Sequence, residues 1–114
     1  MMRSFAYAAF SAVDRCCAGN GGKDRAIDRT ALIEWAQNWQ AFATSQFLWS
    51  YRETMALKPL LLPPPGEAQI LLDAYLLEKA LYELLYELNN RPSWAWIPLT
   101  GILALWDSAA RNSI

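Results

Sequence analysis

Apolar residues recur along the chain in helical periods, interrupted by two segments rich in glycine or proline. Spacings of three and four predict a first helix over residues 2 to about 18, with one apolar face: Phe5, Ala9, Ala12 and Cys16. A second helix is predicted from the N-cap candidates Asp28 and Thr30 to about Leu57. Its aromatic residues form one stripe: Trp35, Trp39, Phe42 and Trp49. We expect this long helix to bend or break near the TSQ of residues 44–46.

The two interruptions predict flexible connections near residues 18–28 and 58–66. The first contains AGNGGKD, and the second contains KPLLLPPPGE with four prolines. Prolines remove backbone donors, so we expect Leu60, Leu61 and Leu62 to form an extended apolar segment. A third helix should follow from about Glu67 to Asn89, and a last helix from about Pro98 to Arg111.

No alternating run predicts a strand, so the fold class is all-α: a small bundle of about four helices in a single domain over residues 1–114. In the third helix one sector is apolar and is predicted to face the core: Ile70, Leu77, Leu81, Leu84 and Leu88. The opposite sector carries Tyr75, Lys79, Tyr82, Glu83 and Tyr86, bordered by Glu78 and Glu87.

This polar sector has two interpretations. It can be a solvated face on which Lys79 and Glu83 form an ordinary i,i+4 pair. It can also be a ligand face, because tyrosine rings, a carboxylate and an ammonium together suit the C–H faces and hydroxyls of a sugar. The three tyrosines favour a ligand, whereas the periodicity fits either interpretation.

Composition adds a second expectation. Of the 114 residues 54% are hydrophobic and six are tryptophan, more than so small a domain can bury. We therefore expect an exposed patch that contacts a partner or the remainder of a larger protein. The net charge of -1 gives no electrostatic reason to bind nucleic acid or an anionic membrane. No apolar run reaches the length of about 18 residues that a membrane span needs.

Several kinds of chemistry are excluded or disfavoured. Cys16 and Cys17 are adjacent, which disfavours a disulfide and fits a reducing cytoplasm. Without histidine or a second cysteine pair the chain offers neither a zinc site nor histidine-dependent catalysis. The GNGG of residues 19–22 lacks the context of a phosphate loop and is interpreted as a linker. Glu78, Glu83 and Glu87 share one helix, which disfavours a glycosidase carboxylate pair.

The run DAYLLEKALYELLYELNNRPSWAWIPLTGIL, residues 73–103, resembles the C-terminal helices of bacterial maltokinases, including those fused to trehalose synthase. The shared pattern is the LLEKALYEL helix, a tyrosine and glutamate one turn later, then NRP, tryptophan, Ile-Pro-Leu and Gly-Ile-Leu. The N-terminal MMRSFAYAA resembles the family's GMLRSFDYAA, which follows the catalytic and metal-binding loops. The resemblance spans nearly the whole chain, weakly through residues 19–57 and strongly at both flanks.

The resemblance implies a kinase fold like that of aminoglycoside phosphotransferases, which binds ATP with magnesium and converts maltose to maltose 1-phosphate in the cytoplasm. It implies that Met1 corresponds to a position inside the kinase, with the ATP-binding lobe and catalytic loop upstream. The chain would then be the helical part of the C-lobe and would hold no cofactor itself. Carried over by position, the sugar contacts would be Lys79, Tyr82, Glu83 and Tyr86.

The chain departs from the family pattern at Ala6, Ser93, Trp96 and Thr100, where the family has Asp, Asp, Arg and Arg.

Two hypotheses follow. The first is a maltokinase C-lobe fragment that is inactive alone and contacts the missing remainder of the kinase. The second is a self-associating helical interaction module, without catalysis, that forms a homodimer through its aromatic and leucine surfaces.

Overall fold

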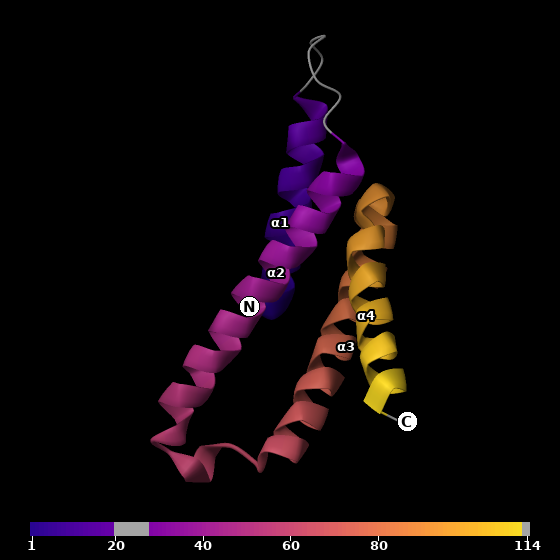
Figure 1. Cartoon of the computed structure of the whole chain (residues 1–114). Coiled ribbons are helices and arrows are strands. Elements are labelled where there is room, and N and C mark those ends of the chain that lie inside the picture. The colour runs from indigo at the N-terminus through magenta and orange to yellow at the C-terminus, as the bar shows by residue number, and fades with distance from the viewer. Residues whose placement is uncertain (20–27, 113–114) are drawn as a thin grey trace. The chain divides into compact units, whose positions relative to one another are not determined.

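The computed structural model describes residues 1–19 and 28–112. Within these ranges it contains four α-helices, two short 3-10 helices and no strand, which confirms the predicted all-α class (Figure 1). The elements are α1 (Met2–Ala18), α2 (Arg29–Ala56), η1 (Pro59–Leu61), α3 (Pro65–Asn90), η2 (Pro92–Trp94) and α4 (Trp96–Asn112). The predicted flexible connection near 18–28 lies mostly outside the described residues.

The chain divides into two compact units, Met1–Lys58 and Pro59–Ile114. The boundary falls at the start of the proline-rich segment, which the sequence marks as a connection. The expectation of a single domain over residues 1–114 stays a prediction.

In the first unit α1 and α2 form an antiparallel helical hairpin. Asp14 and Arg29 form an ion pair of 2.9 Å near one end of the pair. Farther along, the Phe5 ring lies edge-on to Trp39, at 6.2 Å between centroids, and 6.1 Å from Phe47. These contacts join the start of α1 to the middle of α2, and the end of α1 to the start of α2.

The buried face of α1 differs from the predicted one. Ala9 is buried as expected and Phe5 is partly buried, but Ala12 and Cys16 are exposed. The buried side chains of α1 are Ala6, Ala9, Phe10 and Val13. The helical period was correct and the packed face is rotated, because the small side chains on α1 do not define one unique apolar face.

α2 is one continuous helix of 28 residues, so the predicted break near residues 44–46 is wrong, and the alternative of a bend there stays a prediction. The Ser45 hydroxyl donates to the carbonyl of Ala41 at 2.9 Å, which satisfies this polar side chain within the helix. The predicted N-cap is confirmed, because the Asp28 carboxylate accepts from the Thr30 N–H at 2.9 Å. The aromatic stripe is exposed along α2: Trp35, Trp39, Phe42 and Trp49.

The second unit begins with a turn. Residues 59–61 form the 3-10 helix η1, so the expected extended conformation is wrong for Leu60 and Leu61. A 3-10 turn accommodates a proline at its first position, because the backbone N–H that proline lacks would have no hydrogen-bond partner within the helix there. α3 begins at Pro65, two residues before the predicted start, because proline is favourable in the first helical turn.

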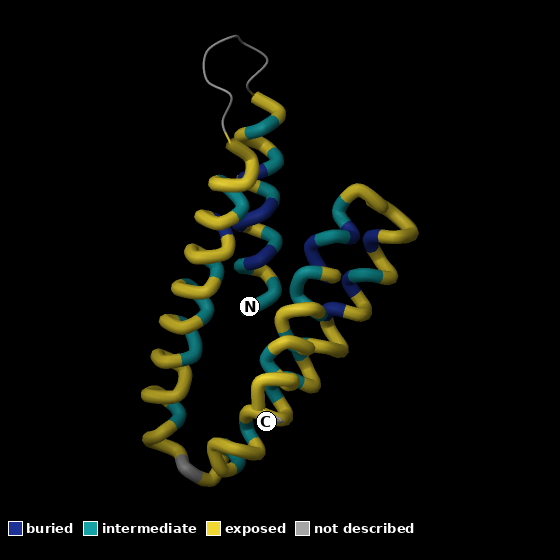
Figure 2. The backbone as a smooth tube through the Cα atoms, turned by 45° about the vertical axis from the view of Figure 1, so that its right-hand side comes forward, coloured by how far each residue is buried: buried dark blue, intermediate teal, exposed yellow. Residues whose placement is uncertain are grey.

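α3 and α4 pack against each other within the second unit. Ala80 is fully buried, and the neighbouring buried residues of α3 are Glu83 and Glu87. The start of α4 supplies Ile97 and Pro98, preceded by buried Ala95. In this unit the buried positions gather near the turn that joins the two helices (Figure 2).

The predicted core face of α3 is therefore wrong for most of its residues. Ile70, Leu77, Leu81 and Leu88 are exposed, and only Leu84 is partly buried. These five residues form what we call the leucine stripe. The buried residues of α3 lie on a neighbouring face instead: Ala80, Glu83 and Glu87. α4 has 17 residues against 26 in α3, so it cannot follow the whole of α3.

Candidate functional site

The polar sector of α3 presents an exposed row of side chains, which we call the tyrosine stripe: Tyr75, Lys79, Tyr82 and Tyr86. The three tyrosines are 67%, 62% and 48% exposed in that order. The four residues of the stripe follow one another at spacings of four, three and four, which keeps them on one side of the helix. The Lys79 ammonium lies 4.9 Å from the centroid of the Tyr82 ring, which is cation–π geometry.

Three of the four predicted sugar contacts thus lie together on this row: Lys79, Tyr82 and Tyr86. Glu83, the fourth, is only 9% exposed and belongs to the buried residues of α3, with Ala80 and Glu87. The predicted placement of Glu83 among solvated residues is therefore wrong. The assignment of all four as sugar contacts stays a prediction.

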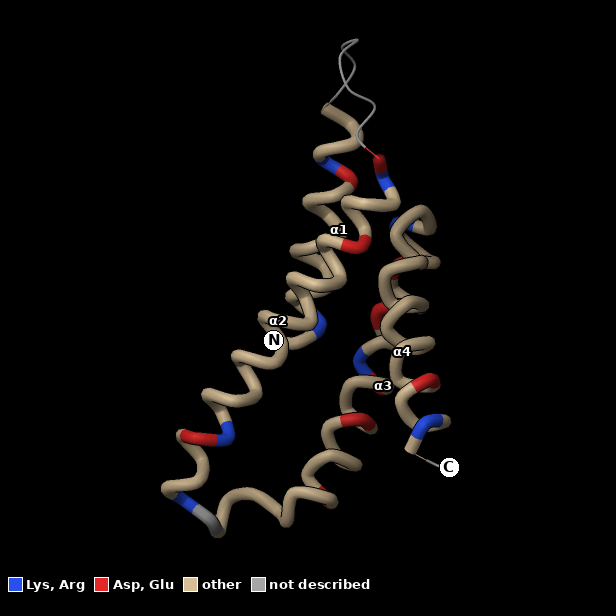
Figure 3. Tube along the Cα trace, in the orientation of Figure 1, with Lys and Arg blue, Asp and Glu red and all other residues tan. Residues whose placement is uncertain are grey.

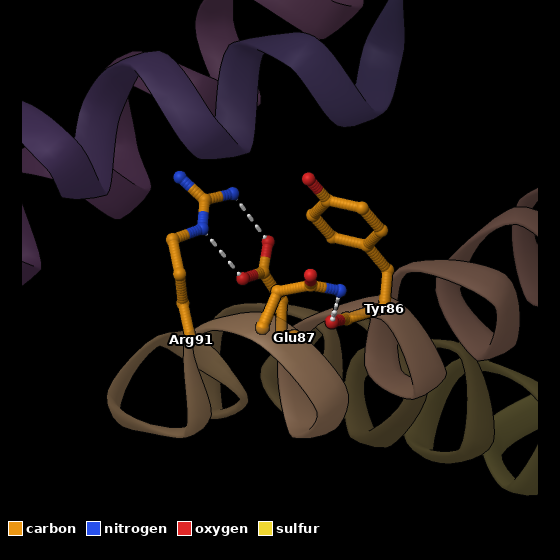
Figure 4. A network of polar contacts seen from close by, with 4 residues as sticks. Tyr86, Glu87 and Arg91 are labelled. Carbon is orange, nitrogen blue, oxygen red and sulfur yellow. Dashed lines mark hydrogen bonds and ion pairs between the residues drawn. The ribbon is translucent and has the colours of Figure 1, made fainter.

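A second polar cluster lies at the C-terminal end of α3, where Glu87 pairs with Arg91. Glu87 is 1% exposed, and its carboxylate accepts two hydrogen bonds from Arg91, Nε to Oε2 at 3.0 Å and Nη2 to Oε1 at 2.8 Å (Figure 4). Two parallel bonds fix the plane of the guanidinium, and ionised partners make each bond stronger than a neutral one. Burial of a carboxylate at this position is stabilised by that pairing.

The same guanidinium contacts two aromatic rings. Its Cζ lies 4.4 Å from the centroid of Trp94 and 5.9 Å from that of Tyr86. The Asn90 side-chain amide also donates to the Tyr86 carbonyl at 2.8 Å. The Glu87–Arg91 pair therefore orders the end of α3 at which the tyrosine stripe finishes.

Sequence reasoning did not assign this cluster to the site. It placed Glu87 at the border of the polar sector and noted only that Arg91 belongs to the NRP turn. A glutamate four residues before an arginine is the ordinary spacing of a surface pair. The signal that could have found the cluster is the combination of that spacing with a helix end and a tryptophan three residues later.

An apolar groove of about 400 Å³ lies between α1 and α2 in the first unit. Its lining is made of small residues of α1 and larger ones of α2: Ala8, Ala9, Ala12, Val13, Cys16, Leu32, Trp35, Ala36 and Trp39. Cys16 and Cys17 are free thiols. The groove contains no charged side chain, so it suits apolar contact rather than acid–base chemistry.

The other charged residues of the described ranges form no dense cluster of one sign (Figure 3). Basic and acidic positions are interspersed in both units (Figure 3). The hydrogen bond that Arg29 donates to the Asp14 carboxylate raises the pKa of Arg29 above its ordinary value, so this side chain stays charged. The pair is solvent-accessible and contributes little to stability. Among the described residues no group of three or more His, Cys, Asp or Glu side chains is arranged to hold a metal ion.

Within residues 1–19 and 28–112 no helix has both the length and the apolar character needed to cross a bilayer. No protein-family model matches the chain, and no solved structure matches it. The tyrosine stripe offers flat rings with hydroxyls and one ammonium, groups that can contact a ligand through apolar faces and hydrogen bonds.

Proposed function

We propose that this chain is the helical part of the C-lobe of a maltokinase-type kinase, in which α3 contributes one wall of the maltose site. In the parent enzyme ATP and magnesium would bind to parts outside this chain, and phosphoryl transfer to maltose would take place in the cytoplasm. Such kinases occur fused to trehalose synthase, so the proposed setting is trehalose and maltose metabolism. Alone, the chain is catalytically inert.

One observation carries the proposal: the resemblance of residues 73–103 to the C-terminal helices of maltokinases, which departs from the family pattern at Ser93, Trp96 and Thr100. The exposed tyrosine stripe supports it, because a sugar contacts aromatic rings through its C–H faces and donates or accepts through its hydroxyls. Lys79 and the tyrosine hydroxyls supply directed hydrogen bonds beside those rings. The buried Glu87–Arg91 pair supports it further, since ordered side chains lose less entropy on binding.

The affinity of the purified chain for maltose tests the proposed sugar wall. We expect weak, saturable binding of maltose, which NMR titration would measure. Lys79→Ala and Tyr82→Ala should each reduce the affinity by about threefold to tenfold, the range expected for the loss of one hydrogen bond or ring contact. Tyr51→Ala is the matched control, because Tyr51 is an exposed tyrosine of the other unit. Equal affinities for all variants would argue against a site on α3.

A kinase assay tests the second half of the proposal. The chain mixed with ATP, magnesium and maltose should consume no ATP above the buffer rate, because phosphoryl transfer requires a phosphate cradle, metal-binding acids and a positioned base. Maltose-dependent turnover that persists through independent purifications, and co-elutes with the chain, would contradict the proposal that this chain alone is inert.

A second candidate function is favoured by the amount of exposed apolar surface. Four of the five residues of the leucine stripe of α3 and all four of the aromatic stripe of α2 are exposed. Such surfaces on small proteins mark sites of protein association. In this alternative the chain is a helical interaction module that pairs with a second copy, and the tyrosine stripe is part of its solvated surface.

A further inference from the structure

The tyrosine stripe is longer than the set of predicted maltose contacts. Those contacts run from Lys79 to Tyr86, about 10 Å along the helix axis at 1.5 Å per residue. Tyr75 lies one turn before Lys79 and extends the row to about 16 Å. It is the most exposed of the three tyrosines, at 67%, and it follows the same helical spacing as the others.

The two ends of the stripe differ. At the C-terminal end, Tyr86 lies beside the Arg91 guanidinium, which is fixed by the buried carboxylate of Glu87. At the N-terminal end, the 67% exposure of Tyr75 leaves most of its side chain open to solvent. A ligand that already contacts Lys79, Tyr82 and Tyr86 can therefore be longer without meeting the Glu87–Arg91 cluster, provided that it extends toward Tyr75.

The chemistry of Tyr75 matches that of the rest of the stripe. Its ring offers a flat apolar surface and its hydroxyl offers one donor and acceptor. Between Tyr75 and Tyr82 stands the Lys79 ammonium, which is held near the Tyr82 ring and can donate to sugar hydroxyls. Alternating rings and a donor suit a chain of sugar rings, in which C–H faces and hydroxyls also recur along the length.

We propose that Tyr75 forms an additional sugar subsite, so that the stripe accepts α-linked glucose oligosaccharides longer than maltose. This inference rests on the proposed function, because it extends the same sugar wall. It adds a substrate class, the maltooligosaccharides, and a residue that discriminates by chain length. Tyr75 contacts the ring farthest from the Arg91 end of α3.

The test compares maltose with maltotetraose on the purified full chain by NMR titration. Tyr75→Ala should weaken the binding of maltotetraose by about threefold to tenfold more than it weakens that of maltose, as expected for one lost ring contact. A longer sugar can bind in more positions and so has a statistical advantage. This advantage cancels when the ratio of the two affinities is compared between proteins. Tyr75→Phe should retain most of the preference, because it keeps the ring.

Tyr51→Ala serves as the matched control and should leave the ratio of the two affinities unchanged. Far-UV circular dichroism of each variant verifies the helices. If maltose binds to the Lys79–Tyr86 segment and Tyr75→Ala affects both sugars equally, the additional subsite is overturned while the proposed function stands. If neither sugar binds, both are overturned.

Discussion

Two hydrogen bonds join the buried carboxylate of Glu87 to the half-exposed side chain of Arg91. Glu87 would be costly to bury as an ion, and the two hydrogen bonds from Arg91 offset that cost. Because the Arg91 side chain is 47% exposed, water weakens the attraction, and the pair contributes less than a fully buried one. Its value lies in geometry: it fixes a cation beside Tyr86 and Trp94.

Arg91→Ala should lower the free energy of unfolding of the second unit by about 1–3 kcal/mol, because it deletes two charge-assisted hydrogen bonds to a buried carboxylate. Chemical denaturation followed by tryptophan fluorescence measures this. Arg111→Ala, near the end of α4, removes the same charge from an exposed position and should cost at most about 0.5 kcal/mol. Equal losses for the two variants would show that the Glu87 contact contributes nothing specific.

Residue chemistry could predict only part of this cluster. Glu87 and Arg91 were visible in the sequence, and so was the end of the helix at Pro92. Burial of Glu87 could not be predicted, because it depends on how the rest of the fold covers the helix. The predicted sugar contacts Lys79, Tyr82, Glu83 and Tyr86 came from a family resemblance. The structure adds that one of them, Glu83, belongs to a packed face.

At the scale of elements, the positions of the helices were predictable and their packed faces were not. Helix ends follow from local signals such as the Asp28 cap and the prolines around η1. A packed face depends on which neighbour covers it. In α3 both the leucine stripe and the row around Ala80 are compatible with helical periodicity, and only the second is buried. Hydrophobicity alone selected the wrong row.

Ala80→Leu tests the buried face of α3. A leucine at this fully buried position should overpack that face and lower the free energy of unfolding by about 1–3 kcal/mol. Ala74→Leu makes the same change at an exposed position of the same helix and should alter stability by less than about 0.5 kcal/mol. Thermal and urea denaturation of the three proteins provide the measurement. A harmless Ala80→Leu would contradict the burial of position 80.

At the scale of the whole molecule, the distinctive property is uncovered apolar surface. Exposed large hydrophobic residues occur on α2, α3 and α4 as well as in η1. A chain of 114 residues has limited surface to bury them against. In the proposed parent enzyme the remainder of the kinase would cover part of this surface. In isolation a second copy is the available partner.

We therefore expect the isolated chain to associate in a concentration-dependent way, as sedimentation velocity would show. Leu81→Lys places a charge in the leucine stripe and should shift the equilibrium toward monomer. Glu78→Lys introduces the same side chain on the same helix beside that stripe and should have a smaller effect. A strictly monomeric wild-type chain at high concentration would count against association through these surfaces.

The central claim is that one face of α3 is a sugar-binding wall, and amide chemical-shift mapping with maltose tests it most directly. On titration with maltose, the account predicts saturable shifts confined to α3 around Lys79, Tyr82, Glu83 and Tyr86. Cellobiose, which differs in its linkage, should shift the same amides less at equal concentration. Shifts that map to the groove between α1 and α2, or no saturable shift at all, would contradict the claim.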